Sequence, residues 1–246
     1  MSDFLLGGTY PTSIKLGTTS VSKLMMGTVQ VWPRLVAVKY GYLYNWFAVA
    51  NTRNIASAGW RVPTQTDWSD LVTYLGGATV AGGKLKETGL TFWDTPNTGA
   101  TNEVGFNGRG VGVRRTDLYS VVFDLVKQST WYWSSTPVNS GTSYGFTLQY
   151  NTQASVLTGA YNRVGYSVRL IKNTTSLTNG QTGIYVGNNG LSYPTICIGT
   201  QEFVSANIRE TQYADATIIP LITDATNWNN DLIGAVCAYN NDESNV

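Results

Sequence analysis

Short runs of alternating apolar and polar residues, separated by turns rich in glycine and asparagine, recur along this 246-residue chain. From residue 92 onwards they are the main pattern, and alternation with a period of two is typical of half-buried β-strands. Only 13% of the residues are charged, about half the usual share for a soluble domain. This composition excludes a disordered charged tail, a coiled coil and a helix bundle. It predicts a fold in which short strands and turns are prominent.

The chain contains no histidine, and this absence excludes several kinds of chemistry. Histidine is the commonest general base and metal ligand, and Ser-His and Cys-His nucleophiles depend on it. Cys197 and Cys237 are too few for a zinc site, which needs about four ligands. They could pair, but their apolar surroundings favour two buried free thiols. We therefore expect a protein that is not an enzyme and that uses no cofactor and no metal.

The charge and hydropathy patterns exclude two further classes of partner. Sixteen basic and fifteen acidic residues give a formal net charge of +1, so no electrostatic attraction to nucleic acid is expected. The longest apolar runs are far shorter than the roughly 20 residues of a membrane span, which predicts no membrane insertion. The first residues lack the basic and apolar regions of a signal peptide.

Residues 12–32 contain a short internal repeat. Two segments, 14–21 and 24–31, each alternate apolar and polar residues around a Gly-Thr pair, which predicts two β-hairpins. Isolated hairpins expose strand edges and bury too little surface to be stable alone. Residues 1–34 are therefore expected to form a β attachment or oligomerisation segment that packs on the main domain or on copies of itself.

The clearest helix signal begins at Thr64. Its hydroxyl is placed to cap the free amides, and Asp67 completes a capping box three residues later. Apolar residues recur at helical spacing up to Leu75, and a Gly-Gly pair then ends the pattern. Further helices are expected at 81–88 and 225–231. The best strand candidates are residues 132–135, 144–150 and 165–171, so the expected fold class is α+β.

Residues 59–71 (GWRVPTQTDWSDL) resemble the signature of the Fibrobacter succinogenes major paralogous domain. Further blocks follow in that family's order: YLYNW at 42–46, GKLKE at 83–87, NEVGF at 102–106, YWSS at 132–135 and GYSVR at 165–169. The resemblance implies a C-type-lectin-like fold, on the branch shared with formylglycine-generating enzymes. It implies core positions for the tryptophans of these blocks: Trp46, Trp60, Trp68, Trp93 and Trp133. The catalytic cysteine pair of those enzymes has no counterpart here.

The usual opening of that family resembles residues 198–242, which lie here at the C-terminal end. The domain is therefore expected to be circularly permuted, which chain ends that lie close together tolerate. Residues 35–246 would form one permuted lectin-like domain, with 35–173 as its main part, 174–192 as a linker or hairpin and 193–246 as the displaced opening. We expect closure within one chain. The alternative is domain swapping, in which this segment completes a neighbouring copy.

The N-terminal repeat ahead of such a domain resembles the ends of head-fibre, collar and tail-fibre proteins of phages that infect Bacteroidetes. This implies a virion structural protein, assembled in the host cytoplasm. We expect a homotrimer whose N-terminal segment binds other virion proteins, while its lectin-like domain binds a host-surface glycan or protein. The alternative is a bacterial or prophage-encoded lectin-like ligand-binding protein, of the kind that retroelements diversify, which is not part of a virion.

The segment between the YWSS and GYSVR blocks supplies the ligand-facing residues in lectin-like proteins diversified by phage retroelements. Alternation over residues 144–151 predicts that Tyr144, Phe146, Leu148 and Tyr150 face inward and that the residues between them face outward. With nearby polar and aromatic residues, the outward set is typical of adaptable binding surfaces. The alternative is an ordinary polar strand surface. The expected ligand-binding residues are Thr147, Gln149, Asn151, Gln153, Tyr161, Asn162 and Arg163.

Residues 227–231 (NWNND) resemble the Trp-Asn-Asp motif of calcium-dependent lectins. Calcium takes about six to eight oxygen ligands, whereas only Asp224 and Asp231 supply nearby carboxylates and the companion Glu-Pro-Asn or Gln-Pro-Asp tripeptide is absent. We therefore expect no metal here and a core position for Trp228. Glu87, Glu103 and Arg109 are likewise expected to form ion pairs inside the domain rather than a catalytic set.

Overall fold

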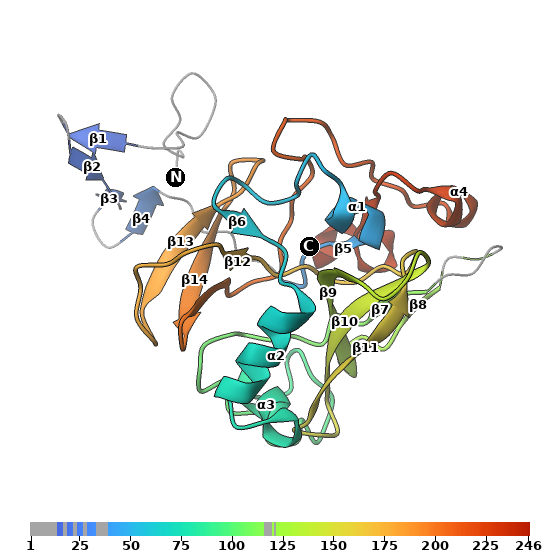
Figure 1. The fold of residues 1–246 in the computed structure, drawn as a ribbon, viewed down its shortest axis with the longest axis horizontal. Helices are drawn as coiled ribbons and strands as arrows, with labels where there is room; N and C mark the ends of the chain where they lie inside the picture. Colours follow the sequence, from blue (N-terminus) through green and yellow to red (C-terminus); the bar gives the residue numbers. More distant parts are fainter. Residues whose placement is uncertain are drawn as a thin grey trace.

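The computed structural model describes residues 39–115, 120 and 122–246, together with the backbone of four short strands between residues 14 and 32. It belongs to the mixed α+β class, and its strands pair antiparallel (Figure 1). Within these residues, no helix has both the length and the apolar character to cross a membrane. The expected fold class is thus observed at the level of α+β.

The backbone of the N-terminal segment forms two hairpins. Strand β1 (Ile14–Leu16) pairs with β2 (Thr19–Val21), and β3 (Leu24–Met26) pairs with β4 (Val29–Trp32). A Gly-Thr pair stands between the strands of each hairpin in the sequence, so the alternation correctly predicts the pairing. The attachment role of residues 1–34 stays a prediction, and the rest of residues 1–38 lie outside the described residues.

A three-stranded sheet, in the order β11-β10-β9, forms one side of the domain. Its strands are β9 (Ser129–Pro137), β10 (Thr142–Gln149) and β11 (Ser155–Tyr161). Helices α2 (Gln65–Tyr74) and α3 (Ala78–Leu85) pack against it. Two of the three strand candidates, 132–135 and 144–150, are therefore confirmed, and the second expected helix begins and ends three residues earlier than predicted.

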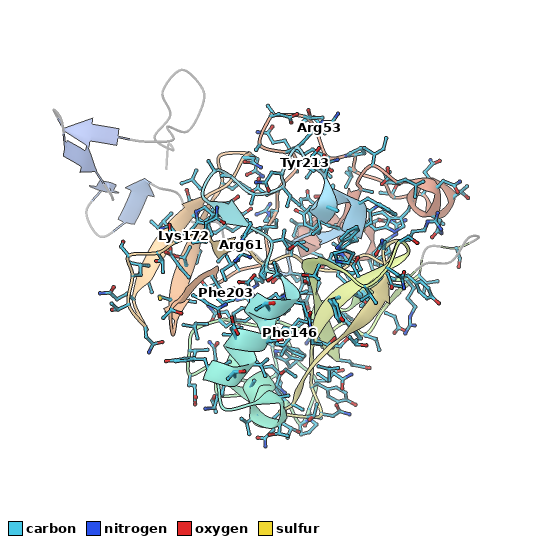
Figure 2. All side chains as sticks on the ribbon, in the orientation of Figure 1. Arg53, Arg61, Phe146, Lys172, Phe203 and Tyr213 are labelled. Atoms are coloured by element: carbon cyan, nitrogen blue, oxygen red, sulfur yellow. The ribbon has the colours of Figure 1, made fainter. Side chains whose placement is uncertain are left out.

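Helix α2 begins with the expected capping box. The amide of Asp67 donates to Thr64 Oγ1 at 3.2 Å, while the amide of Thr64 donates to the Asp67 carboxylate at 2.6 Å. Trp68, one turn further, is fully buried and stacks on Phe146 with 4.6 Å between ring centroids. It also stacks on Phe203 at 5.7 Å, and both phenylalanines lie beside α2 (Figure 2). The helix thus joins the first sheet to the C-terminal part of the chain.

A five-stranded sheet contains strands from both parts of the chain. Its order is β13-β14-β15-β12-β6. The strands are β6 (Trp60–Arg61), β12 (Ile171–Lys172), β13 (Thr182–Val186), β14 (Ser192–Ile198) and β15 (Gln201–Val204). Ile171 pairs with Phe203 on one side and with Arg61 on the other. The residues expected as a linker or hairpin therefore supply β13, which forms a hairpin with β14.

Shorter elements complete the domain. Strand β5 (Leu43–Tyr44) pairs with β16 (Val236–Cys237), and β7 (Val113–Arg114) pairs with β8 (Phe123–Asp124). Helix α1 (Trp46–Ala50) follows β5, and α4 (Ala225–Asn230) occupies the expected position near the C-terminal end. Two single 3₁₀ turns, Tyr239–Asn241 and Glu243–Asn245, end the chain.

The expected strand at 165–171 is mostly wrong. Only its last residue belongs to a named strand, β12. Gly165, Tyr166 and Ser167 instead form single bridges to Arg114, Tyr44 and Tyr132, which belong to three different strands. The segment passes from one partner strand to the next and is buried along its length. Its alternation of apolar and polar residues therefore does not mark a continuously paired strand.

Two buried arginines bind the C-terminal segment to the rest of the same chain. Arg114 donates to the carbonyl oxygens of Ile222, Thr223 and Asp224 at 2.6–3.1 Å, and its guanidinium lies 4.1 Å from the ring of Trp228. Arg169 donates to Val204 O at 3.0 Å. In this structure, residues 198–242 therefore pack on the first part of their own chain.

The buried aromatic and sulfur-containing side chains largely follow the sequence prediction. Trp60, Trp68, Trp93 and Trp133 are buried as expected, whereas Trp46 is half-buried. Both cysteines are buried free thiols, which confirms the preferred interpretation. Burial raises the pKa of Cys237 to about 11, so this thiol is a packing group and a poor nucleophile.

Candidate functional site

The hairpin of β10 and β11 divides the expected ligand-binding residues into two groups. Seven residue pairs join the strands, from Thr142 with Tyr161 at one end to Leu148 with Ser155 at the other. Gln149, Asn151 and Gln153 lie at the closed end, where a turn joins β10 to β11. Residues 161–163 lie at the open end, where β11 finishes. At about 3.3 Å per residue, the two ends are roughly 20 Å apart. The expected residues therefore do not form one continuous face.

Two of these residues are buried, contrary to expectation. Thr147 is 2% exposed and Asn162 is 3% exposed. Thr147 lies opposite Trp131 of β9 and Val156 of β11, and directly opposed residues place their side chains on the same face. Thr147 is therefore buried between its neighbours, although Val156 on the same face is 46% exposed. The side chain of Asn162 is held away from solvent by a hydrogen bond, in which its Oδ1 accepts from the Ser143 hydroxyl at 2.8 Å.

The closed end of the hairpin is supported by a lysine that the sequence analysis missed. Lys86 is fully buried, and its Nζ donates to the carbonyl oxygens of Thr98, Gln149 and Thr152 at 2.8–2.9 Å. Burial lowers the pKa of Lys86 to about 8. The lysine fixes the backbone beneath exposed Gln149 and Asn151. Its place in the GKLKE block is the sequence signal that could have identified it.

The open end of the hairpin borders a cleft of about 620 Å³, which we call the Tyr161 cleft. Phe47 comes from α1, Ser140 and Gly141 from the turn between β9 and β10, and Asn229 and Leu232 from α4 and the residues after it. Tyr161, Asn162 and Arg163 complete the lining. Tyr161 is 69% exposed and Leu232 is 58% exposed, so the rim presents apolar surface to solvent.

The backbone beneath the Tyr161 cleft is held by two tryptophans and an asparagine. The indole Nε1 of Trp228 donates to Arg163 O at 2.6 Å, and the amide of Trp46 donates to Asn162 O at 2.8 Å. The backbone amide of Asn162 donates to Gly141 O at 3.0 Å. Asn162 is therefore a positioning residue that fixes the loop, while the side chains of Tyr161 and Arg163 project from it and are exposed.

The cleft combines the groups that small polar ligands need. A volume of a few hundred Å³, an apolar lining and a few fixed polar groups are typical of sites for small molecules. Tyr161 supplies an exposed ring with a hydroxyl, Arg163 supplies a guanidinium, and the backbone behind them is rigid. The arrangement can bind a ligand through an aromatic ring, a guanidinium and the polar groups of its lining.

The family model of the Fibrobacter succinogenes major domain matches residues 34–172, more than half of the chain. The chain belongs to this family. No curated protein and no solved structure matches it. The family domain therefore includes α1–α3 and both strands of the β10–β11 hairpin.

The Tyr161 cleft lies where the family domain meets the C-terminal segment. Residues 140–163 belong to the matched part, whereas Asn229 and Leu232 lie beyond residue 172. The sequence prediction found Tyr161 and Arg163 but missed Phe47 and Leu232. Phe47 on α1 and Leu232 after α4 reach the cleft only through tertiary packing near the open end of the hairpin, which no local sequence pattern encodes.

The NWNND segment supplies the last four residues of α4 and the residue that follows it. Asp224 caps the helix, accepting from the Asn227 amide at 2.8 Å, and Asp231 accepts from Asn45 Nδ2 at 2.8 Å. Trp228 is buried as expected. Within the described part of the chain, no group of three or more cysteine or acidic side chains is placed to hold a metal ion. The carboxylates of Asp224 and Asp231 thus bind groups of the protein itself, the Asn227 amide and Asn45 Nδ2.

The expected ion pairs are confirmed in the family domain. Arg109 Nε lies 2.6 Å from Glu87 Oε2, and Lys84 Nζ lies 3.0 Å from Glu103 Oε1. The three residues that could mimic a catalytic set therefore belong to two separate pairs.

Proposed function

We propose that this chain is a phage virion structural protein, of the head-fibre, collar or tail-fibre kind, that displays its family domain for adhesion to the host surface. The domain would be a circularly permuted C-type-lectin-like domain on the formylglycine-generating branch. The N-terminal hairpins would bind other virion proteins within a homotrimer. The ligand would be a glycan or protein of the host surface, bound without cofactor or covalent chemistry.

The contacts of the C-terminal segment support the permutation. If residues 198–242 are the displaced opening of the domain, they should complete the sheet and core of the matched part. Strand β15 pairs with β12, and β16 pairs with β5. Arg114 and Arg169 bind carbonyl groups of the segment from the matched part. These contacts are what a permuted single domain requires.

The Tyr161 cleft is the observation that carries the adhesion proposal. Sugars present apolar ring faces edged by hydroxyl groups, and aromatic rings with a polar tip suit such surfaces. Tyr161 offers the ring, and Arg163 offers several hydrogen-bond donors in a fixed geometry. A shallow cleft of this kind binds weakly by itself, and several copies on one particle would raise the avidity.

The test is adhesion of the fluorescently labelled full chain to Bacteroidetes host cells. Tyr161→Ala and Arg163→Ala are each expected to weaken cell binding about tenfold, because each removes an exposed group worth roughly 1.4 kcal/mol. The matched control is Tyr74→Ala, which removes an exposed aromatic ring on α2 outside the cleft and should leave adhesion unchanged. Undiminished adhesion of both cleft variants would exclude the cleft.

The virion part of the proposal has its own readout. Mass spectrometry of purified phage particles is expected to detect the chain at a copy number that is a multiple of three. Finding the chain only in bacterial cell fractions would contradict the virion assignment while leaving adhesion open to test.

A further inference from the structure

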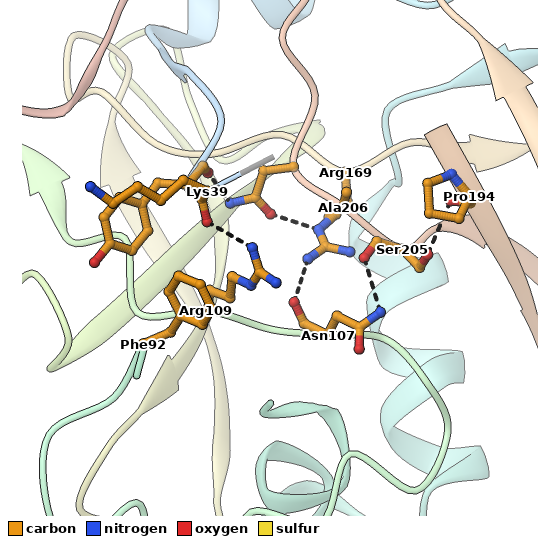
Figure 3. A pocket seen from close by; sticks show the side chains of 10 residues that line it. Lys39, Phe92, Asn107, Arg109, Arg169, Pro194, Ser205 and Ala206 are labelled. Carbon is orange, nitrogen blue, oxygen red and sulfur yellow. Dashed lines mark hydrogen bonds between the residues drawn. The ribbon is translucent and has the colours of Figure 1, made fainter. Parts of the chain in front are cut away.

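A second cavity, of about 400 Å³, lies between the family domain and the C-terminal segment. We call it the cationic cavity. Its basic lining residues are Lys39, Arg109 and Arg169 (Figure 3). The lining also includes Tyr40, Phe92 and Asn207. It shares no lining residue with the Tyr161 cleft.

The lining of this cavity is basic in a chain that is nearly neutral. It contains three of the sixteen basic residues and no acidic residue. The nearby carboxylates of Glu87 and Asp94 are not part of the lining. Glu87 pairs with Arg109, and Asp242 lies close enough to Lys39 to interact with it, so neighbouring carboxylates offset the three cations, while the lining itself carries only positive charge. Clefts lined by one sign of charge concentrate counter-ions of the other sign.

Arg169 forms a rigid, charged floor. It is 1% exposed, and it donates to Asn207 Oδ1 at 2.7 Å, Phe106 O at 2.8 Å and Asn107 O at 2.9 Å. These acceptors are neutral, so they satisfy the hydrogen bonds without cancelling the charge. Burial lowers the pKa of Arg169, Tyr132 opposes that shift, and the positive charge of nearby Arg109 lowers the pKa further.

The other two cations lie nearer to solvent and are held in place. The guanidinium of Arg109 lies 3.9 Å from the centre of the Phe92 ring, and its Nη1 donates to Lys39 O at 3.0 Å. Lys39 is exposed, and its Nζ donates to Asn245 Oδ1 at 2.8 Å. Figure 3 shows Arg109 and Arg169 together beside Lys39. An anion entering the cavity therefore meets preorganised positive charge, which lowers the entropic cost of binding.

We propose that the cationic cavity binds the carboxylate or sulfate group of a monosaccharide-sized anion. The cavity is larger than an isolated carboxylate needs, and its volume falls within the range of small-molecule sites. Asn107 and Ser205 border the same space, and the Ser205 hydroxyl, which donates to Pro194 O at 3.0 Å, keeps an oxygen that can accept from the remainder of such a ligand. This inference stands on the cavity alone and does not depend on adhesion through the Tyr161 cleft.

The test is isothermal titration of the full chain, at low ionic strength, with D-glucuronate, galactose 6-sulfate and neutral D-glucose. We expect at least one acidic sugar to bind and glucose to give no measurable heat. Lys39→Gln and Arg109→Gln should each weaken binding of that acidic sugar about tenfold. The matched control is Arg115→Gln, which removes an exposed arginine paired with Asp124 outside the cavity and should not change the affinity.

The arms of the experiment separate the two sources of negative charge. Tighter binding of glucuronate identifies a carboxylate ligand, and tighter binding of the sulfated sugar identifies a sulfate ester. Lys39→Gln keeps the test valid even if Arg109→Gln disturbs the Glu87 pair, because the Lys39 side chain is exposed. Binding of glucose as tight as that of the better acidic sugar, no heat from either acidic sugar, or an equal loss in Arg115→Gln would overturn the proposal.

Discussion

At the scale of single residues, three buried basic side chains are held by neutral groups. Lys86, Arg114 and Arg169 each donate to three or more carbonyl or amide oxygens. A buried ion is costly unless its hydrogen bonds are satisfied, and loops with several carbonyl groups aimed inward meet that need. These three side chains therefore fix the loops that border the hairpin and the C-terminal segment.

Glu210 is the buried acid with the clearest consequence for stability. It is fully buried, its Oε2 accepts from the Asn189 amide at 3.3 Å, and Tyr185 lies 3.5 Å from Oε1. Burial raises the pKa of Glu210 to about 8. The folded state therefore retains the proton after the unfolded chain has lost it, so the contribution of Glu210 to stability is full at acidic pH and declines as pH rises towards 8.

This gives a prediction that can be measured by urea denaturation. Between pH 5 and 7 the free energy of unfolding of the native chain should fall by about 1 to 3 kcal/mol. Glu210→Gln keeps the shape but cannot ionise, so its unfolding free energy should change much less over the same range. The absence of histidine removes the commonest competing titration from this window. Parallel pH profiles for the two proteins would rule out a raised pKa at Glu210.

At the scale of secondary structure, the sequence predicts those helices and strands whose formation depends on neighbouring residues. The capping box of α2, the strands β9 and β10 and the helix α4 could be predicted because caps and alternation depend on neighbouring residues. The segment 165–171 could not, since its partners lie on three different strands. Thr147 was placed wrongly for a related reason: alternation separates the two faces of β10 but cannot show that Thr147 is buried between Trp131 and Val156.

The candidate site shows the same limit. Tyr161 and Arg163 follow a predicted strand and could be found from the sequence. Phe47 and Leu232 reach the Tyr161 cleft only because α1 and α4 pack near the open end of the hairpin. The cationic cavity likewise depends on tertiary packing, because its three basic residues are far apart within the family domain and its other wall comes from residues 194–207.

The start of α2 offers a prediction at this scale. Thr64→Ala removes the hydroxyl that accepts from the Asp67 amide, and the loss of such a cap should lower the free energy of unfolding by about 1 kcal/mol. Thr66→Ala makes the same chemical change at an exposed position of the first turn and should stay within about 0.5 kcal/mol of the native value. Chemical denaturation of both variants measures the difference, and equal losses would contradict the assigned role of Thr64.

At the scale of the whole molecule, the family domain and the C-terminal segment share their sheets and their core. The five-stranded sheet passes from the C-terminal segment to the family domain where β15 meets β12, and Trp68 of the family domain stacks on Phe203 of the segment. Removing residues 173–246 would therefore expose the edge of β12 and the faces of several aromatic rings. The two parts are expected to unfold together as one cooperative unit.

The N-terminal hairpins lead to the last prediction, which concerns the oligomer. Each hairpin has only two short strands, too few to be stable alone, so the proposed trimer would stabilise them by packing copies together. Light scattering should give a trimer for the full chain and a folded monomer for residues 35–246. A trimer that survives the truncation would assign assembly to the C-terminal domain, by a direct interface or by exchange of residues 193–246. A full-length monomer would contradict self-assembly of the hairpins and leave trimer formation to contacts within a virion.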